Sequence, residues 1–282
     1  MRILVTGATG LVGSHFAETY LHKNELLTPS PKELDITEKK SVADYFRRHR
    51  SDAVIHFAAF TDVGAAEKDR GNKIGQAWVV NVEGTKNLAE AAKRAGSYFI
   101  HISTDMVFPG NKERPGPYDE DDPIEEEPGN LSWYGWTKNR AEHWLKANLK
   151  NLAIVRISNP ARAMYPKKLD YVRKILALYD ESKLYPLFTD QYLTLTNIHE
   201  LSAALRKLLK KRTIGIFHVT SRNLYTPFAL GNYLIWKARR KKNAVKPTSI
   251  DTFLHQPNAA RRYMKFSGLK TENTQKALNV RL

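Results

Sequence analysis

Short apolar runs alternate with amphipathic segments along most of the chain. The runs that predict strands are residues 3–5, 52–57, 98–103, 152–157 and 215–219, and the segments with helical periodicity include 11–22, 41–49 and 82–95. Strands that alternate with helices of this length form crossover units, which place parallel strands in one sheet and helices on both of its faces. The pattern therefore predicts a doubly wound α/β fold.

Composition supports a folded chain and excludes several classes. With 282 residues, of which 42% are hydrophobic, the chain can bury a sizeable core. It has no cysteine, which excludes a disulfide scaffold, a thiolate zinc site and a cysteine nucleophile. No apolar run reaches the ~18 residues of a membrane span, and the start of the chain lacks the apolar region of a signal peptide. We expect a cytoplasmic protein without a membrane partner.

Charge favours a polyanionic ligand. Forty-five Lys and Arg against 29 Asp and Glu leave a net charge of +16, and such a surface attracts anions over long distances. The basic runs 207–212 and 237–242 adjoin helical patterns and are interpreted first as solvated helix ends. A Pro-rich loop over 109–130 carries the acidic runs 119–122 and 125–127. We expect these acids on a solvated surface, and no metal site.

A glycine-rich turn indicates the cofactor. Gly7, Gly10 and Gly13 follow the first predicted strand and open the first predicted helix. In such a turn one glycine allows the bend, another lets the backbone approach a pyrophosphate, and the third permits close packing of helix on strand. The spacing is G-x-x-G-x-x-G and not the commoner G-x-G-x-x-G, so the three glycines alone are weak evidence. Their place between a predicted strand and a predicted helix, near the N-terminus, favours dinucleotide binding on a Rossmann sheet. The alternative is a tight turn that binds nothing.

The strand and helix alternation weakens after Asn159. We assign residues 1–158, together with about 192–214, to a dinucleotide-binding domain. Residues from about 159–191 and from 215–282 are assigned to a smaller C-terminal substrate-binding domain.

The end of the second predicted strand distinguishes NAD from NADP, because a carboxylate there accepts from a ribose 2′-hydroxyl and repels a 2′-phosphate. Residues 26–32 contain no acid, and Ser30 and Lys32 are near. This favours NADPH over NADH. Asp35, next to Ile36, comes too late for the ribose position and could meet the adenine ring.

Tyr134 and Lys138 suggest acid chemistry. Four residues apart on a helix, their side chains share one face. A neighbouring ammonium favours phenolate and is expected to lower the pKa of the tyrosine towards working pH. The spacing alone is weak evidence, because the pairs 179/183 and 233/237 match it.

Position separates Tyr134 from those two pairs. About thirty residues upstream, a predicted strand ends in Ser103, Thr104 and Asp105, which delivers hydroxyls to the carboxyl edge of the sheet, where ligands of such folds bind. A hydroxyl, a phenol and a lysine beside a nicotinamide form a carbonyl reduction site. The alternative for Thr104 is a strand-end cap.

These residues resemble an extended short-chain dehydrogenase/reductase and, within that superfamily, dTDP-4-dehydrorhamnose reductases. The resemblance covers residues 1 to about 220. Its motifs are Thr-Gly-Ala-Thr-Gly-Leu-Val-Gly at 6–13, Leu-Asp-Ile-Thr at 34–37, Ala-Ala-Phe-Thr at 58–61, Asn-Val-Glu-Gly-Thr at 81–85, Ser-Thr-Asp at 103–105, and Tyr134 with Lys138.

The resemblance implies a role for each site residue. Thr104 would hydrogen-bond the sugar ketone and Tyr134 would donate the proton. Lys138 would hold the nicotinamide ribose and lower the tyrosine pKa, and Asn81 would support the site. The implied cofactor-binding residues are Gly7, Thr9, Gly10, Leu11, Val12, Asp35, Ile36, Ala58, Ala59, Thr61, Ser103, Tyr134 and Lys138, and the candidate substrate-binding residues are Thr104, Asp105, Met106, Arg261 and Arg262.

The chain departs from the family at three places. Met106 replaces the usual tyrosine after Ser-Thr-Asp, Gly64 occupies an expected acidic position, and a C-terminal Arg-Pro segment appears only as Gln-Pro-Asn at 256–258. Arg261 and Arg262 follow. They are candidates for a diphosphate clamp, since guanidinium binds phosphate oxygens in a bidentate fork, and exposed arginines are the alternative.

Three functions compete, of which two are enzymatic and one is regulatory. The first is NADPH-dependent reduction of the 4-keto group of a dTDP- or UDP-linked deoxysugar. The second keeps the fold but is a nucleotide-sugar epimerase with tightly bound NAD, and the third is a non-catalytic NADP-binding regulatory subunit resembling the β subunit of methionine adenosyltransferase. No nucleic-acid recognition module appears in the sequence, so we expect no nucleic-acid partner. The sequence leaves open whether the protein forms a homodimer.

Overall fold

A six-stranded parallel sheet forms the centre of the computed structural model, which describes residues 1–20, 22, 25–254 and 263–282. The strand order is β2-β1-β3-β4-β5-β9, and the predicted doubly wound α/β fold is confirmed. The order reverses direction between β1 and β3, and ligands of such sheets bind at the carboxyl ends of the strands beside this point. The strands are β1 (Ile3–Thr6), β2 (Leu26–Leu27), β3 (Ala53–His56), β4 (Tyr98–Thr104), β5 (Leu152–Ile157) and β9 (Gly215–His218).

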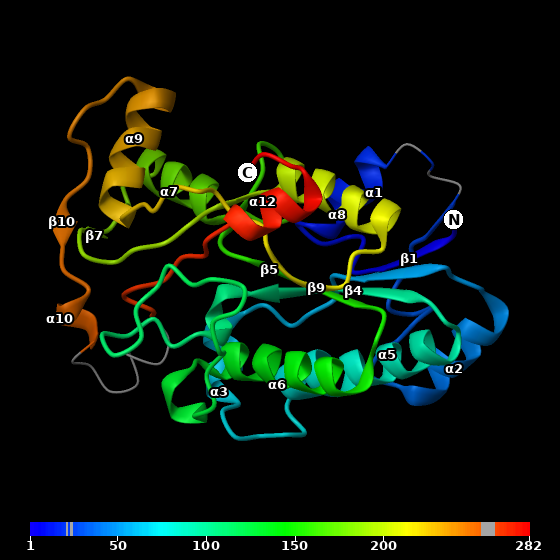
Figure 1. Ribbon diagram of the computed structural model, residues 1–282. Coiled ribbons are helices and arrows are strands. Elements are labelled where there is room, and N and C mark those ends of the chain that lie inside the picture. Colours follow the sequence, from blue (N-terminus) through cyan, green and yellow to red (C-terminus); the bar gives the residue numbers. More distant parts are fainter. Residues whose placement is uncertain (21, 23–24, 255–262) are drawn as a thin grey trace.

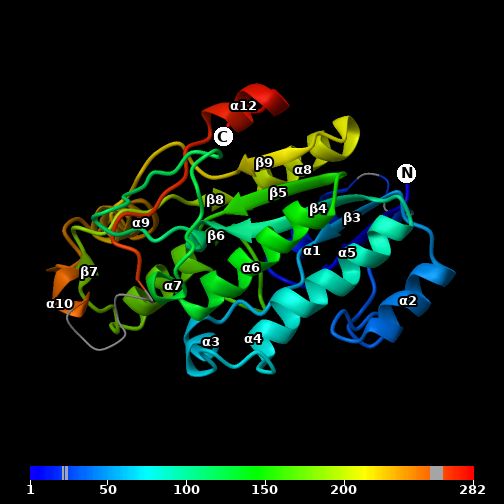
Figure 2. The same cartoon turned by 60° about the horizontal axis from the view of Figure 1, so that its bottom comes forward.

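Helices cover both faces of this sheet (Figure 1). Side chains alternate along a strand, so Ile3 and Val5 of β1 pack under one layer of helices, and Leu4 packs under the other. Figure 2 is turned to the second face, where α5 and α6 cross in front of the strands. The first layer holds α1 (Gly13–Thr19), α8 (Ile198–Lys211) and α12 (Glu272–Leu278), and the second holds α2 (Lys39–Arg48), α5 (Thr85–Arg94) and α6 (Trp133–Asn148).

A smaller unit lies beyond the carboxyl edge of the sheet, at the left of Figure 1. Its own core contains Ile175, Leu187, Ile235 and Val245. It is built from α7 (Tyr171–Asp180), α9 (Pro227–Arg239), α10 (Asp251–Leu254) and the parallel pair β7 (Leu187–Phe188) and β10 (Pro247–Thr248). The remaining short elements are α3 (Val63–Lys68), α4 (Gln76–Trp78), the π-helical η2 (Val79–Gly84), η3 (Asp105–Val107), η4 (Pro128–Asn130), and the pair β6 (Pro160–Ala161) and β8 (Thr196–Asn197).

The sequence-based division into domains differs from the structure at one strand. Residues 215–218 were assigned to the smaller unit, whereas β9 pairs with β5 at the edge of the main sheet. The helix α12, from the same assigned segment, packs against α8 and β9. The chain passes from α8 directly into β9, and its hydrophobic pattern does not show that this strand belongs to the main sheet. The division as a whole stays a prediction.

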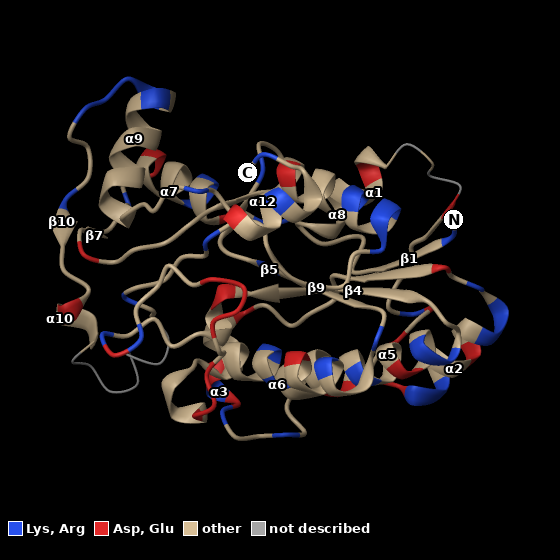
Figure 3. Cartoon of the chain, in the orientation of Figure 1, with Lys and Arg blue, Asp and Glu red and all other residues tan. Residues whose placement is uncertain are grey.

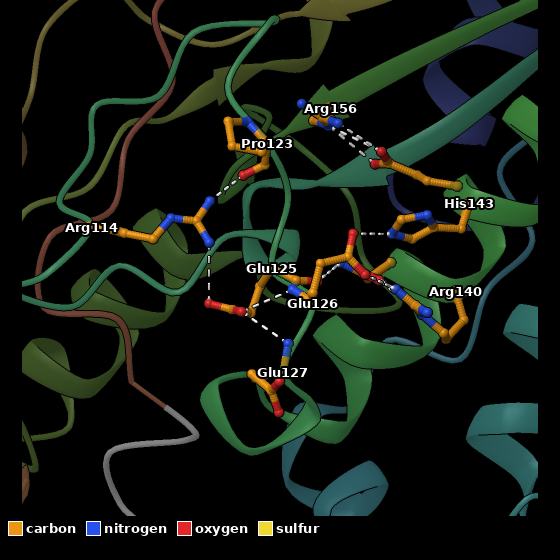
Figure 4. A network of polar contacts seen from close by, with 10 residues as sticks. Arg114, Pro123, Glu125, Glu126, Glu127, Arg140, His143 and Arg156 are labelled. Atoms are coloured by element: carbon orange, nitrogen blue, oxygen red, sulfur yellow. Dashed lines mark hydrogen bonds and ion pairs between the residues drawn. The ribbon is translucent and has the colours of Figure 1, made fainter.

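The expectation of a solvated acidic loop is wrong for two of its carboxylates. Glu120 and Glu125 are buried, with exposed fractions of 6% and 5%. Glu125 accepts the backbone N–H groups of the two residues after it and forms an ion pair with Arg114, as Figure 4 shows. These internal partners compensate the burial of the charge. Within the described ranges no group of acids or histidines is arranged to hold a metal ion.

Candidate active site

A cavity of about 1550 Å³ lies at the carboxyl edge of the sheet, between the glycine-rich turn, the start of α6 and the smaller unit. Such a volume accommodates a dinucleotide together with a second ligand. The cavity brings together most of the predicted site residues: Gly7, Thr9, Gly10, Leu11, Val12, Asp35, Ile36, Ala58, Ala59, Thr61, Ser103, Thr104, Asp105, Met106, Tyr134 and Lys138. Arg261 and Arg262 lie outside the described residues, and Asn81 lies behind the cavity wall.

The glycine-rich turn has the shape that a pyrophosphate requires. Gly7 has a φ of +71°, and a Cβ there would approach the backbone nitrogen of Ala58 to 2.6 Å. A Cβ on Gly13 would collide with the carbonyl oxygen of Gly7. Only glycine fits both positions, so the chain keeps a cradle of bare backbone at the cavity, which suits a dinucleotide phosphate. Ser103 adds a buried hydroxyl without a hydrogen-bond partner on the cavity wall.

A strap after β6 lies across this turn, and sequence reasoning missed it. The phenol of Tyr165 donates to the carbonyl of Thr9 at 2.6 Å. Arg162 donates to Ser14 Oγ at 2.9 Å and to the carbonyl of Leu11 at 3.3 Å. These bonds tie the smaller unit to the glycine-rich turn. They join residues about 150 positions apart, and no local pattern announces them.

Tyr134 enters the cavity from the first turn of α6. The helix begins there because Ser132 accepts the backbone N–H of Gly135 at 3.0 Å, which is an N-cap bond. Burial raises the pKa of Tyr134 above its ordinary value, the Asp105 carboxylate adds to the rise, and a hydrogen bond with Thr104 opposes it. The expected lowering of this pKa by Lys138 is therefore wrong for the chain alone, because burial and the Asp105 carboxylate both favour the neutral phenol.

Lys138 is buried on the same helix, with an exposed fraction of 2%. Its Nζ lies 3.0 Å from Nε2 of His101 on β4. Burial lowers the pKa of Lys138 to about 7, and Glu142 opposes the shift. Among the described residues no carboxylate lies within ion-pair distance of Lys138. Sequence reasoning did not single out His101, although it stands two residues before Ser103 on the predicted strand.

Thr104 and Asp105 form one unit at the end of β4. Thr104 Oγ1 donates to Asp105 Oδ1 at 3.0 Å and accepts the N–H of Met106, so the strand-end cap foreseen as an alternative is present. Asp105 Oδ2 accepts from Ser158 and Ser267, each at 2.7 Å. Both oxygens of Asp105 are thus used within the protein, and its side chain fixes the orientation of Thr104.

Asn81 supports the site from η2. Its Oδ1 accepts the N–H of Phe60 at 2.8 Å, and its Nδ2 donates to Thr137 Oγ1 at 2.9 Å. Because Asn81 is fully buried and does not line the cavity, it holds the loop after β3 against α6. It therefore positions the helix that carries Tyr134 and Lys138.

The turn after β2 holds a carboxylate that the stretch 26–32 does not contain. The backbone N–H and the hydroxyl of Ser30 both donate to Glu33 Oε2 at 2.8 Å. These bonds lower the pKa of Glu33 and keep it charged. Ser30 is engaged in its own turn. Pro31 lines the cavity, and the neighbouring Lys32 is exposed.

Aromatic and basic residues of the smaller unit line the far part of the cavity. Phe188 contacts Phe253 and Tyr263 edge to face, with ring centroids 5.2 and 6.4 Å apart. Lys168 and Lys174 bring positive charge to the same region. The hydrophobic pattern of the sequence did not distinguish these aromatic residues from core residues. Tyr171 and Tyr185 complete the aromatic wall.

The two basic runs lie away from the cavity. Residues 207–212 include the end of α8 and residues 237–242 include the end of α9, where the ribbon of Figure 3 is blue. The Lys and Arg residues of both runs are exposed. None of these residues lines the cavity, and their interpretation as solvated helix ends is confirmed. No helix in the described part of the chain combines the length and apolarity of a bilayer span.

Fold and site together define a class: a short-chain dehydrogenase/reductase of the extended type, with a threonine, a tyrosine and a lysine at the carboxyl edge of a Rossmann sheet. The family model described as "RmlD substrate binding domain" matches residues 1–282, and the chain belongs to this family.

Proteins similar to this chain carry related names. A dTDP-4-dehydrorhamnose reductase of Burkholderia thailandensis is 32% identical over 238 residues, which cover 78% of this chain and 73% of the relative. The spore coat polysaccharide biosynthesis protein SpsK of Bacillus subtilis is 30% identical, with 78% and 73% covered. A solved dTDP-4-dehydrorhamnose reductase of Bacillus anthracis, in complex with NADP, superposes with a TM-score of 0.83 at 28% identity and covers 99% of this chain and 93% of that one.

Proposed function

We propose that this protein reduces the 4-keto group of a nucleotide-activated deoxysugar, with NADPH as the hydride donor. The observation that carries the proposal is the meeting of Thr104, Tyr134 and Lys138 at one cavity with the glycine-rich turn. The names of the similar reductases support the same reaction.

The chain's own residues supply the acid chemistry. A reduced nicotinamide, when bound in this cavity, would supply the hydride to the ketone carbon. The oxygen of the ketone becomes an alkoxide as the carbon is reduced, and Tyr134 gives it the phenolic proton. The raised pKa of Tyr134 keeps that proton in place at neutral pH. The single proton of the Thr104 hydroxyl points to Asp105 Oδ1 in the free protein. When the ketone binds, this hydroxyl turns and donates its proton to the ketone oxygen instead.

The turn after β2 supports NADPH over NADH. A carboxylate that is free to accept from the ribose 2′-hydroxyl marks an NAD site. Glu33 is the carboxylate of that turn, and it already accepts two hydrogen bonds from Ser30. Lys32 is exposed beside the cavity residue Pro31 and supplies positive charge for a 2′-phosphate.

The smaller unit is suited to the nucleotide half of the substrate. Aromatic rings such as Phe188 and Phe253 offer faces on which a base stacks. Lys168 and Lys174 offer ammonium groups for a diphosphate. Arg261 and Arg262 remain candidates for the same role.

The test compares Tyr134→Phe with Tyr233→Phe. Purified wild-type protein should oxidise NADPH when it is given a dTDP- or UDP-linked 4-keto-6-deoxyhexose. Tyr134→Phe should lose at least ~100-fold in kcat, as expected for a general acid, and should still bind NADPH. Tyr233, exposed on α9 with Lys237 at the same spacing, is the matched control and should keep full activity.

Three outcomes would contradict this proposal. Turnover that persists in Tyr134→Phe would remove the proton donor from the mechanism. Stoichiometric NAD in the purified protein, with no net oxidation of NADPH, would indicate the epimerase. Copurification of a stoichiometric partner without ketoreductase activity would indicate the regulatory subunit.

A further inference from the structure

One row of polar side chains crosses the buried sheet beneath the active site. Thr6 of β1, His56 of β3 and His101 of β4 are register partners on neighbouring strands. All three are buried, and the two imidazole rings lie 5.5 Å apart. They share the sheet face covered by α5 and α6, because each has the parity of an apolar residue that packs there, such as Val54 or Phe99.

The two histidines of this row have different partners. His56 is saturated, since Nδ1 bonds with Thr6 Oγ1 at 2.7 Å and Nε2 with Thr85 Oγ1 at 3.0 Å. His101 has Lys138 Nζ at 3.0 Å from Nε2, and its Nδ1 has no hydrogen-bond partner. A buried polar atom without a partner costs free energy. His56 is therefore a satisfied core residue, whereas His101 is bonded only toward the active-site lysine.

Other charged groups near Lys138 are occupied. Glu142, one turn further along α6, bonds with Arg156 of β5. Asp105 receives the hydroxyls of Thr104, Ser158 and Ser267. Tyr134 is a neutral phenol, and burial keeps both histidines neutral by lowering their pKa values. The described partner of the Lys138 ammonium is thus an uncharged imidazole.

We propose that His101 is a positioning residue, whose Nε2 lone pair holds Lys138 Nζ at the cavity wall without cancelling its charge. The proposal rests on the reductase function. A carboxylate at this place would neutralise the ammonium, whereas the imidazole leaves its charge available to a ribose hydroxyl and to Tyr134. His101 does not line the cavity, so it acts through Lys138.

The contact between His101 and Lys138 should affect how NADPH affinity depends on pH. The ammonium is the form that donates to a ribose hydroxyl, so NADPH affinity should fall as the pH rises through the pKa of Lys138, about 7. Accepting a hydrogen bond from the ammonium stabilises the charged form. Removal of the acceptor should therefore move this midpoint to a lower pH.

The experiment measures NADPH affinity against pH for four proteins. His101→Leu should bind ~10-fold to 100-fold more weakly at neutral pH, as expected when a buried charged donor loses its partner, and its midpoint should move down by about one pH unit or more. His101→Gln, whose amide oxygen accepts the same bond, should restore the wild-type midpoint. His56→Leu is the matched control: it removes the neighbouring histidine and should lower stability without moving the midpoint.

A second measurement needs no cofactor. Thermal unfolding of each protein is followed against pH, and the rise in stability that accompanies deprotonation of Lys138 should begin at a lower pH in His101→Leu than in the other three. Equal midpoints in His101→Leu and wild type, or equal shifts in His101→Leu and His56→Leu, would overturn the proposal. If wild type reduces no 4-keto sugar while these pH midpoints shift as expected, the reductase function is wrong, but the positioning of Lys138 by His101 is retained. If wild type reduces the sugar but the pH midpoints are the same in all four proteins, the role of His101 is wrong and the reductase function is retained.

Discussion

Ser267 Oγ donates a hydrogen bond of 2.7 Å to Asp105 Oδ2, and so joins two residues that are 162 positions apart. Ser158, directly after β5, donates to the same oxygen. The other carboxylate oxygen accepts from Thr104. The orientation of the Thr104 hydroxyl at the active site therefore depends on a segment near the C-terminus, through one carboxylate.

Replacement of Asp105 should impair catalysis more than cofactor binding. In Asp105→Asn an NH₂ group replaces one of the two acceptor oxygens, and the hydroxyls that donate to them lose a partner. We expect kcat/KM for the sugar to fall ~10-fold to 100-fold, the range for a lost bond to a charged group, with unchanged NADPH affinity. Steady-state kinetics and cofactor titration check this, and an equal loss of NADPH affinity would contradict it.

The effect of Ser267 on catalysis can be separated from its effect on stability. Ser267→Ala removes one hydrogen bond to a carboxylate and should cost ~1.5–3 kcal/mol of unfolding free energy. Ser249 donates to Asp190 at 2.6 Å in the smaller unit, so Ser249→Ala loses a bond of the same kind away from Thr104. Denaturant unfolding should show a loss of stability for both variants, and a smaller loss for Ser249→Ala because its bond is only part-buried. Only Ser267→Ala should also lower kcat.

The parts of the site that are local in sequence could be predicted. The glycine-rich turn, the strand end at Ser103 and Thr104, and the pair Tyr134 and Lys138 each occupy one short segment. Parallel strands bring their carboxyl ends to one edge, and this rule sufficed to place the three segments at one cavity. The fold class followed from the same alternation of strands and helices.

Contacts between distant segments could not be predicted. The bond from Tyr165 to Thr9 and the bond from Lys138 to His101 depend on tertiary packing, which a single sequence does not reveal. Burial also reversed one expectation: a nearby lysine favours phenolate, yet desolvation raises the pKa of Tyr134. The prediction that Glu125 is solvent-exposed was wrong for a similar reason. The sequence does not show whether an acidic side chain has hydrogen-bond partners inside the protein.

The buried pair of Glu142 and Arg156 should be sensitive to the loss of one partner. Arg156 Nη2 lies 2.8 Å from Glu142 Oε2 at exposed fractions of 1% and 0%, and Figure 4 shows dashed lines from Arg156 to this carboxylate. Glu142→Gln leaves a buried guanidinium without its counter-charge and should cost ~3–5 kcal/mol. Urea unfolding measures this cost.

An exposed pair gives the control for that measurement. Asp180 and Arg239 lie 2.6 Å apart with about two fifths of each side chain exposed, at 43% and 42%. Solvent screens such a pair, so Asp180→Asn should cost less than ~1 kcal/mol. Equal costs for Asp180→Asn and Glu142→Gln would contradict the role assigned to burial.

Gly135 should not tolerate a side chain. A Cβ at this position would collide with the carbonyl oxygen of Met106, which belongs to the turn after Thr104. Gly135→Ala should therefore push that turn away from α6, lower stability by ~1–3 kcal/mol and lower kcat. Gly129 has nothing within 4 Å of its ideal Cβ, so Gly129→Ala should change stability by less than ~0.5 kcal/mol. Thermal unfolding and kinetics of both variants check the contrast.

Lys138 should make the stability of the cofactor-free protein depend on pH. Burial lowers its pKa from 10.5 to about 7, so between these values the unfolded chain binds a proton that the folded chain does not. Stability therefore rises with pH across this window, at up to ~1.4 kcal/mol per pH unit. Lys138→Met keeps the length of the side chain and removes the titration. The variant should be more stable than wild type near pH 7, and the difference should shrink towards pH 10.5. Parallel stability curves for the two proteins would show that Lys138 is not buried as a titrating amine. The same variant should lose NADPH affinity, because it removes the ammonium that donates to the ribose hydroxyl. A gain in stability together with a loss of binding is typical of a residue kept for function.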